Sequence, residues 1–150
     1  MRLTVLHGPN MNLLGQREPE RYGSATLAEL NQQLTDLAEA MGVALRIEQH
    51  NYEGGLVEAV HRAAAGDGLL INPAAYTHTS VALRDALLGT GIPTVEVHMT
   101  EPKTREAFRQ INMIEDIALA RFAGAGVASY TEGLRKLVDL LRERAKNPHL

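Results

Sequence analysis

His-Gly-Pro-Asn-Met-Asn-Leu-Leu-Gly-Gln-Arg-Glu-Pro-Glu-Arg-Tyr-Gly, residues 7–23, separates an apolar run at Leu3–Leu6 from a helix start at Thr26–Glu29. The change from apolar to polar residues predicts a loop at the end of a strand, and such loops carry chemistry more often than packing. A cation near a tyrosine lowers the pKa of its hydroxyl from an ordinary value of about 10. Arg17 and Tyr22 are therefore a candidate base with its activator, and two solvated loop residues are the alternative.

Apolar runs alternate with helical patterns along the whole chain. Thr26 and Glu29 match a capping box, and Gly42 matches a C-terminal stop. The alternation predicts a parallel sheet with helices on both faces, in a flavodoxin-like doubly wound α/β fold. We expect a single catalytic domain over 1–150 with a polar tail over 146–150. The expected strands are 3–6, 43–47, 68–71, 94–97 and 117–122, and the expected helices are 27–41, 56–65, 80–88, 105–111 and 130–145.

Composition excludes several classes of function. The chain has 150 residues, a net charge of −3 and no cysteine, which excludes disulfides, thiolate catalysis and cysteine-bound metal. Because no basic run is present, nucleic acid is not expected as the main partner. No apolar run reaches the roughly 20 residues that span a bilayer, and no signal-peptide pattern is expected at the N-terminus. We therefore expect a cytoplasmic protein that binds neither nucleic acid nor membrane.

Unusual polar residues gather where the expected strands end. Parallel strands place their carboxyl ends along one edge of the sheet, which is where doubly wound folds bind ligands. We therefore expect these side chains to meet in one cleft. They are Asn10, Asn12, Arg17 and Tyr22 after the first strand, Asn51 and Glu53 after the second, Asn72, Thr77, His78 and Thr79 after the third, and Glu96, His98, Thr100, Arg105 and Arg109 at or after the fourth.

Glu96 and His98 are two positions apart on a strand, so their side chains share one face. A carboxylate beside an imidazole fixes its tautomer and keeps it protonated, as a general acid requires. A buried ion pair without a catalytic role is the alternative. With His78 the pair would also form a possible metal-ligand set.

The other candidates have structural alternatives as well. Asn72 can end a strand by bonding its own backbone, and His78 can belong to a helix N-cap, although a helix N-terminus also favours an anionic ligand. Arg105 and Arg109 are expected on one helical face, either as a clamp for a carboxylate or as a solvated surface.

Four blocks of the chain resemble the signature of the type II 3-dehydroquinate dehydratases, or type II dehydroquinases. The resemblance covers roughly residues 2–141. It implies a flavodoxin-like fold and the anti elimination of water from 3-dehydroquinate, through an enolate, to give 3-dehydroshikimate. It implies neither a metal nor a Schiff base, so no cofactor is expected. The blocks are Gly8–Gly15 with Arg17–Pro19 and Tyr22–Gly23, then Asn72–Ala86, then Glu96–His98, then Arg105–Arg109.

Carried over residue by residue, the resemblance assigns the catalytic roles. Tyr22, as a tyrosinate, would take the proton at C2, next to the ketone, and Arg17 would lower its pKa. Asn10 would steady the developing enolate through an ordered water. His98 would protonate the leaving C1 hydroxyl, and Glu96 would orient His98.

The resemblance also implies the contacts to the substrate. Asn72 and His78 would hydrogen-bond substrate hydroxyls. The backbone amides of Met99 and Thr100, with the Thr100 hydroxyl, would hold the carboxylate. Arg109 would hold the ring hydroxyl on the far side.

Family members form trimers that assemble into dodecamers, and the residue matching Asp85 reaches a neighbour's site. The resemblance thus implies a homododecamer that serves the shikimate pathway of aromatic amino acid biosynthesis or quinate breakdown.

Glu101 and the segment 111–113 depart from the family's pattern. Glu101 brings a negative charge towards the expected carboxylate site, and Ile-Asn-Met replaces the family's His-Ser-Tyr. A divergent paralogue that binds quinate-like hydroxy acids with low or altered turnover is therefore the alternative function. A phospho-receiver would need acidic residues after the first strand, and a flavin module would need aromatic stacking partners. Neither pattern is present.

Overall fold

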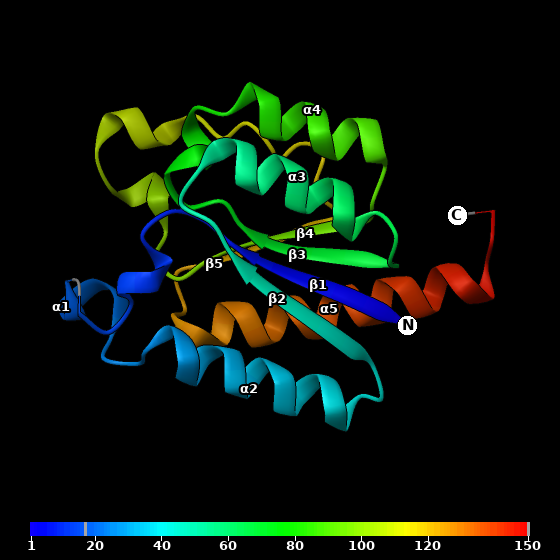
Figure 1. The fold of residues 1–150 in the computed structure, drawn as a ribbon. Coiled ribbons are helices and arrows are strands. Elements are labelled where there is room, and N and C mark those ends of the chain that lie inside the picture. Colours follow the sequence, from blue (N-terminus) through cyan, green and yellow to red (C-terminus); the bar gives the residue numbers. More distant parts are fainter. Residues whose placement is uncertain (17, 150) are drawn as a thin grey trace.

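The computed structural model describes residues 1–16 and 18–149, and of Tyr22 it describes the backbone only. Five parallel strands form one sheet in the order β2-β1-β3-β4-β5 (Figure 1). The chain moves outwards from β1 to β2 and then returns to the other side of β1, so the strand order reverses there. This is the predicted flavodoxin-like arrangement, with a crevice at the reversal. The strands are β1 (Arg2–His7), β2 (Ala44–Gln49), β3 (Gly68–Asn72), β4 (Thr94–His98) and β5 (Ala120–Ala123).

Helices cover both faces of the sheet, as predicted. α2 (Leu27–Ala40) and α5 (Val127–Lys146) lie on one face, and α3 (Glu53–Ala63) and α4 (Val81–Thr90) lie on the other (Figure 1). The side chains of neighbouring β1 residues point to opposite faces of the sheet, because side chains alternate along a strand. Val5 packs with the α2 and α5 layer, and Leu6 packs with the α3 and α4 layer. Within the described part of the chain, no helix is both long and apolar enough for a membrane crossing.

The start and end of α2 follow the predicted signals. The Thr26 hydroxyl accepts a hydrogen bond from the Glu29 amide at 3.1 Å, and the Glu29 carboxylate accepts one from the Thr26 amide at 3.4 Å. Gly42 follows the helix with φ +73, a left-handed conformation that favours glycine. The capping box and the stop are therefore confirmed.

The fifth strand begins later than predicted. The expected range was 117–122, but β5 starts at Ala120. Ile117 lies in a turn, where its amide donates to the Ile114 carbonyl at 3.1 Å, and its side chain packs against the core under α3 and α4. The apolar character of Ile117 thus reflects packing on a helix layer rather than a place in the sheet.

The prediction of a helix over 105–111 is wrong. Two 3₁₀ turns, η3 (Pro102–Thr104) and η4 (Ala107–Gln110), stand there instead. Arg105 and Glu106 between them have extended backbone, with ψ −153 and 150. A spacing of four therefore does not place Arg105 and Arg109 on one α-helical face.

Gly8 brings the loop after β1 against the loop after β3. Its amide donates to the Asn72 carbonyl at 2.7 Å. A Cβ at this position would lie 2.4 Å from the Pro73 carbonyl oxygen, closer than real side chains come, so only glycine fits. This close approach holds the segment with Asn10 beside the segment with Asn72.

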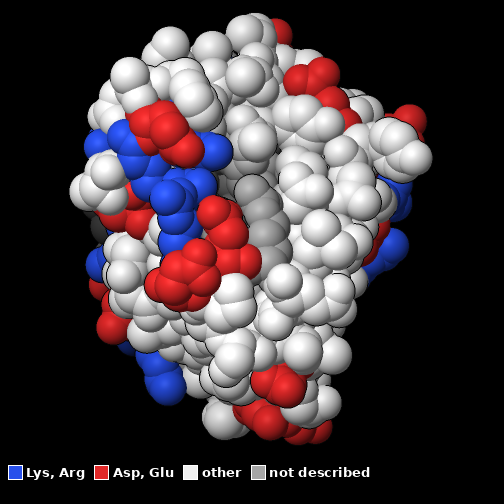
Figure 2. Space-filling model, turned by 90° about the vertical axis from the view of Figure 1, so that its left-hand side faces the viewer, with Lys and Arg blue, Asp and Glu red and all other residues white. Residues whose placement is uncertain are grey.

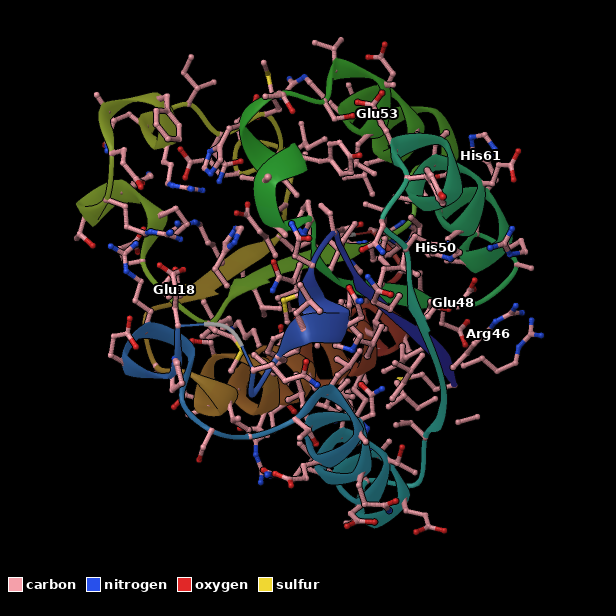
Figure 3. The ribbon with its side chains drawn as sticks, turned by 60° about the vertical axis from the view of Figure 1, so that its left-hand side comes forward. Glu18, Arg46, Glu48, His50, Glu53 and His61 are labelled. Atoms are coloured by element: carbon pink, nitrogen blue, oxygen red, sulfur yellow. The ribbon has the colours of Figure 1, made fainter. Side chains whose placement is uncertain are left out.

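The edge strand β2 carries a charged cluster on the face of the sheet that α3 covers. Glu48 pairs with Arg46 at 3.1 Å, with His50 at 3.0 Å and with Arg62 at 2.7 Å. Figure 3 shows Arg46 and Glu48 on β2 and His50 just beyond its end, well apart from Glu18. Charges on an edge strand oppose pairing with a second sheet, so this cluster belongs to the surface of the fold.

Candidate active site

A pocket opens at the carboxyl edge of the sheet. It holds about 720 Å³ of empty space, a volume that includes space open to solvent. Figure 2 views the molecule from this edge and shows positive and negative side chains interleaved in one band, while much of the rest of the face is uncharged. The lining residues are Pro9, Asn10, Met11, Leu14, Asn72, Ala74, Ala75, His78, His98, Met99, Thr100, Pro102, Arg105 and Arg109.

The pocket brings together most residues to which the sequence gave a catalytic or binding role. The residues Asn12, Asn51, Glu53, Thr77 and Thr79, which were also expected in the cleft, do not line it. Asp85 does not line it: this residue lies exposed on α4. Arg17 falls outside the described residues, and so does the side chain of Tyr22, whose backbone ends α1 (Pro19–Tyr22). The predicted residues that do line the pocket are Asn10, Asn72, His78, His98, Met99, Thr100, Arg105 and Arg109.

Glu96 lies behind His98, away from the pocket. His98 Nε2 and Glu96 Oε2 are 2.5 Å apart, and the Glu96 side chain is fully buried. Burial alone would raise the pKa of Glu96, but hydrogen bonds from His98 and Asn112 and the charge of Arg121 outweigh it and hold the pKa below its usual value. Glu96 is therefore ionised and accepts a hydrogen bond from the His98 ring. Because Nε2 is bonded to Glu96, the other ring nitrogen, Nδ1, is left for a ligand.

Asn112 holds the Glu96 carboxylate from the opposite side. Its Nδ2 donates to both Glu96 oxygens, at 2.7 and 3.1 Å. Its own Oδ1 accepts from the amides of Ile114 and Glu115 at 2.9 and 3.0 Å. The sequence showed Asn112 only as a departure from a family pattern. The structure shows that this position still supports the Glu96–His98 pair.

Replacing Asn112 by alanine should lower the free energy of unfolding by about 1–3 kcal/mol, because a buried carboxylate loses a donor. Urea unfolding at pH 7 measures the loss, with the exposed residue Asn147 changed to alanine as the matched control. Unfolding midpoints equal to that control would show that the amide does not stabilise Glu96.

Glu101 does not line the pocket, contrary to the expectation from its place after Thr100. Arg121 of β5 binds it with two hydrogen bonds, Nη1–Oε2 at 3.0 Å and Nη2–Oε1 at 2.8 Å. These bonds hold the pKa of Glu101 below its usual value. Arg121 also lies 3.4 Å from Glu96. The extra negative charge is therefore matched by a cation, on the β5 side of the fold.

Hydrogen bonds to the backbone orient two side chains at or after the end of β3, those of Asn72 and His78. His78 Nδ1 donates to the Ile111 carbonyl at 2.7 Å, so in the neutral ring Nε2 remains as an acceptor. Asn72 is 4% exposed, and its Oδ1 accepts from the Ala74 amide at 3.0 Å. Ala74 has a left-handed backbone, φ 53. The turn after β3 thus aligns Asn72 and His78 at one wall.

Asn10 reaches the pocket from an unusual backbone conformation, φ 68. Its amide donates to Asn51 Oδ1 at 3.0 Å, and Gln49 Nε2 donates to the same oxygen at 2.9 Å. The sequence predicted Asn51 in the cleft with the other strand-end residues, but it does not line the pocket. It holds the Asn10 loop in place from the end of β2.

Arg105 and Arg109 line the pocket although no α-helix carries them. Arg109 Nε donates to Glu106 Oε2 at 2.5 Å, and its guanidinium lies 5.1 Å from the centre of the Phe108 ring. Two guanidinium groups at one pocket favour an anionic or hydroxyl-rich ligand.

Comparison with known proteins shows the family of this chain. The family model described as "Dehydroquinase class II" matches residues 1–138. The 3-dehydroquinate dehydratase of Bordetella avium (strain 197N) is 52% identical over 139 residues, covering 91% of this chain and 96% of its own length. The same enzyme of Trichodesmium erythraeum (strain IMS101) is 50% identical over 143 residues, covering 95% of each chain. The chain belongs to the class II dehydroquinase family.

A solved class II dehydroquinase has the same fold. The type II dehydroquinase from Butyrivibrio crossotus DSM 2876 superposes with a TM-score of 0.89 at 33% identity, covering 92% of this chain and 97% of that structure. Membership in the family makes this chain a lyase. The Glu96–His98 pair and the polar pocket described above therefore lie in an enzyme and not in a receiver or flavin module.

Beneath the pocket of this dehydroquinase-family chain lies a buried histidine, His7. Burial lowers its pKa to about 4 from an ordinary 6.5, although the hydrogen bond with Asn31 opposes the shift. The unfolded chain therefore binds more protons between these values, and the folded state loses stability as pH falls from 6.5 to 4. The full loss is about 3 kcal/mol.

A His7→Gln variant should lack this dependence, because glutamine does not titrate. Urea unfolding from pH 4.5 to 7.5 measures both proteins. The carboxylates Glu96 and Glu101, whose pKa values are lowered from 4.5, lose their contributions only below that pH. Parallel pH curves for the two proteins would contradict the prediction.

Proposed function

We propose that this chain catalyses the anti elimination of water from 3-dehydroquinate, giving 3-dehydroshikimate through an enolate, with Tyr22 as base and His98 as acid. The observation that carries the proposal is the buried carboxylate of Glu96, 2.5 Å behind a histidine that lines the pocket. The family relationship supplies the substrate, since its members are 3-dehydroquinate dehydratases.

The first step of the proposed reaction removes a proton from C2. The ketone at C3 already acidifies this C–H bond, so a base and an oxyanion donor are sufficient. Tyr22 would be the base, with Arg17 keeping it ionised, and Asn10 would steady the enolate through a water. The placement of Asn10 in the pocket supports its part of the scheme.

The second step expels the C1 hydroxyl. His98 would donate the proton from Nδ1, because its Nε2 already faces Glu96. The ionised Glu96 stabilises the imidazolium before transfer, which is the role of an orienting carboxylate in general acid catalysis. The leaving group would depart as water.

The remaining pocket residues would bind the substrate. Met99 and Thr100 would hold the carboxylate, and Arg109 a ring hydroxyl. The position of Glu101, paired with Arg121 outside the pocket lining, supports this assignment, since its charge is matched by a guanidinium. His78 offers an acceptor to a hydroxyl.

Assembly and cellular role are part of the same proposal. Asp85 is exposed on α4 and outside the lining of this chain's own pocket. It could therefore serve a neighbouring subunit in trimers that build a dodecamer. The reaction would belong to the shikimate pathway or to quinate breakdown, in the cytoplasm.

An activity assay tests the proposal. The purified chain is incubated with 3-dehydroquinate, and the enone absorbance of the product is followed, together with calorimetry of 3-dehydroshikimate binding. The proposal expects both turnover and binding. Binding without turnover would favour the divergent paralogue. The absence of both binding and turnover would reject the substrate assignment.

A further inference from the structure

Four polar side chains form a hydrogen-bonded chain that runs from the pocket into the core. Asn72 Nδ2 lies 2.9 Å from the Tyr130 hydroxyl, which lies 2.9 Å from His7 Nδ1, and His7 Nε2 lies 2.8 Å from Asn31 Oδ1. Tyr130 and His7 are fully buried. Of the four, only Asn72 lines the pocket. The scheme proposed above gives no role to Tyr130, His7 or Asn31.

Each bond in this chain has one direction. The Asn72 oxygen accepts from the Ala74 amide at 3.0 Å, so its NH₂ group faces Tyr130 and donates. The Tyr130 hydroxyl has one hydrogen, which goes to His7 Nδ1. The buried His7 is neutral and has one donor and one acceptor. Its Nε2–H therefore donates to the Asn31 oxygen. The donor direction set at Asn72 is thus consistent with the acceptor found at Asn31.

This series of hydrogen bonds determines whether the Asn72 amide presents a donor or an acceptor to a ligand. One hydrogen of its NH₂ group goes to Tyr130, and the other faces the Met11 sulfur at 3.6 Å. The oxygen has two acceptor sites, and Ala74 uses one of them. The group left for the pocket is therefore an acceptor. A buried amide that turned over would place its oxygen against the Tyr130 oxygen, whose one hydrogen is already donated to His7, so that contact would have no hydrogen between the two oxygens.

We propose that Tyr130 and His7 are positioning residues that fix the Asn72 amide with its oxygen towards the pocket, so that this wall selects a ligand hydroxyl and rejects a carbonyl. The proposal rests on the proposed function, because it takes the ligand to be a polyhydroxylated ring. It adds a specificity that Asn72 by itself, with an amide free to turn over, would not have.

Calorimetry with keto ligands tests the selection. The probes are 3-dehydroshikimate and its two keto analogues, in each of which one ring hydroxyl is oxidised to a carbonyl, an acceptor without a hydrogen to donate. For the unmodified protein we expect one analogue to bind about tenfold more weakly than the parent, as loss of one hydrogen bond in a buried site implies. Asn72→Ala should abolish that difference and so identify the hydroxyl that Asn72 receives.

Tyr130→Phe is the decisive variant, with Tyr52→Phe, an 80% exposed tyrosine, as its control. We expect Tyr130→Phe to reduce the tenfold difference to about twofold or less, because the amide can then turn over and serve either ligand. Tyr52→Phe should keep the full difference. A folded Tyr130→Phe protein that still discriminates tenfold would overturn the proposal. If Tyr130→Phe does not fold, His7→Leu removes the acceptor of Tyr130 and carries the same expectation.

A measurement without ligand separates this proposal from the proposed function. Imidazole ¹⁵N–¹H correlation spectra of the unmodified protein between pH 6 and 8 should show His7 with a protonated Nε2 and a bare Nδ1. A His7 ring protonated at Nδ1 would reverse the direction of the chain and overturn the inference. If no ligand binds, the proposed function fails, and the spectra still decide the direction.

Discussion

Replacing Tyr22 by phenylalanine should lower kcat about 10²–10⁴-fold, the usual contribution of a general base. The substitution removes the proposed base and keeps the aromatic ring. Initial rates of enone formation from 3-dehydroquinate measure the effect. KM should change little, since the hydroxyl would act on C2 and not on substrate binding.

Tyr52→Phe is the matched control, because Tyr52 is 80% exposed and outside the pocket. A Tyr22→Phe enzyme with a kcat equal to this control would reject Tyr22 as the base. Arg17→Ala separates the electrostatic role from the chemical one. Without the cation, the tyrosine ionises at higher pH, so the rate should recover partly as pH rises. A flat profile for Arg17→Ala would contradict activation by the guanidinium.

Replacing His98 by asparagine should lower kcat by a similar factor, about 10²–10⁴-fold, but at a different step. Asparagine can still donate a hydrogen bond to the buried carboxylate of Glu96, so the fold loses little. It cannot deliver a proton to the leaving hydroxyl. Removal of the C2 proton should continue, because the base is unchanged.

Deuterium exchange distinguishes this outcome from general damage. In D₂O, the His98→Asn enzyme should return 3-dehydroquinate labelled at C2 faster than it forms product. His61→Asn, on the exposed surface of α3, is the control and should behave like the unmodified enzyme. Equal losses of exchange and of dehydration would show that His98 does not act in the second step alone.

The convergence of the site was predictable from topology. Asn10, Asn72, His78, His98 and Arg109 all end or follow a strand of the sheet, and all of them line the pocket. Parallel strands bring their carboxyl ends to one edge whatever the details of packing. The prediction therefore needed only the alternation of strands and helices, which apolar periodicity shows well.

The segment after β4 was the least predictable part. The spacing of Arg105 and Arg109 suggested an α-helix, but the chain makes two 3₁₀ turns there. Short turns have no period of their own, and this segment is shaped by side-chain bonds. Asn112 caps the amides of Ile114 and Glu115 while it holds Glu96, and Arg121 binds Glu101 across the loop.

The sequence by itself determined the α/β class, the alternation of its five strands with the long helices and the family, because periodicity, capping signals and contiguous motifs are local. The tertiary structure decided which groups are paired with one another and which line the pocket. Glu101 is paired with the Arg121 guanidinium of β5. Asn72 is hydrogen-bonded to Tyr130 of α5, which is in turn hydrogen-bonded to His7 of β1. These partners are far apart in the chain, and a hydrogen bond acts only at about 3 Å. Their roles therefore follow from the folded arrangement alone.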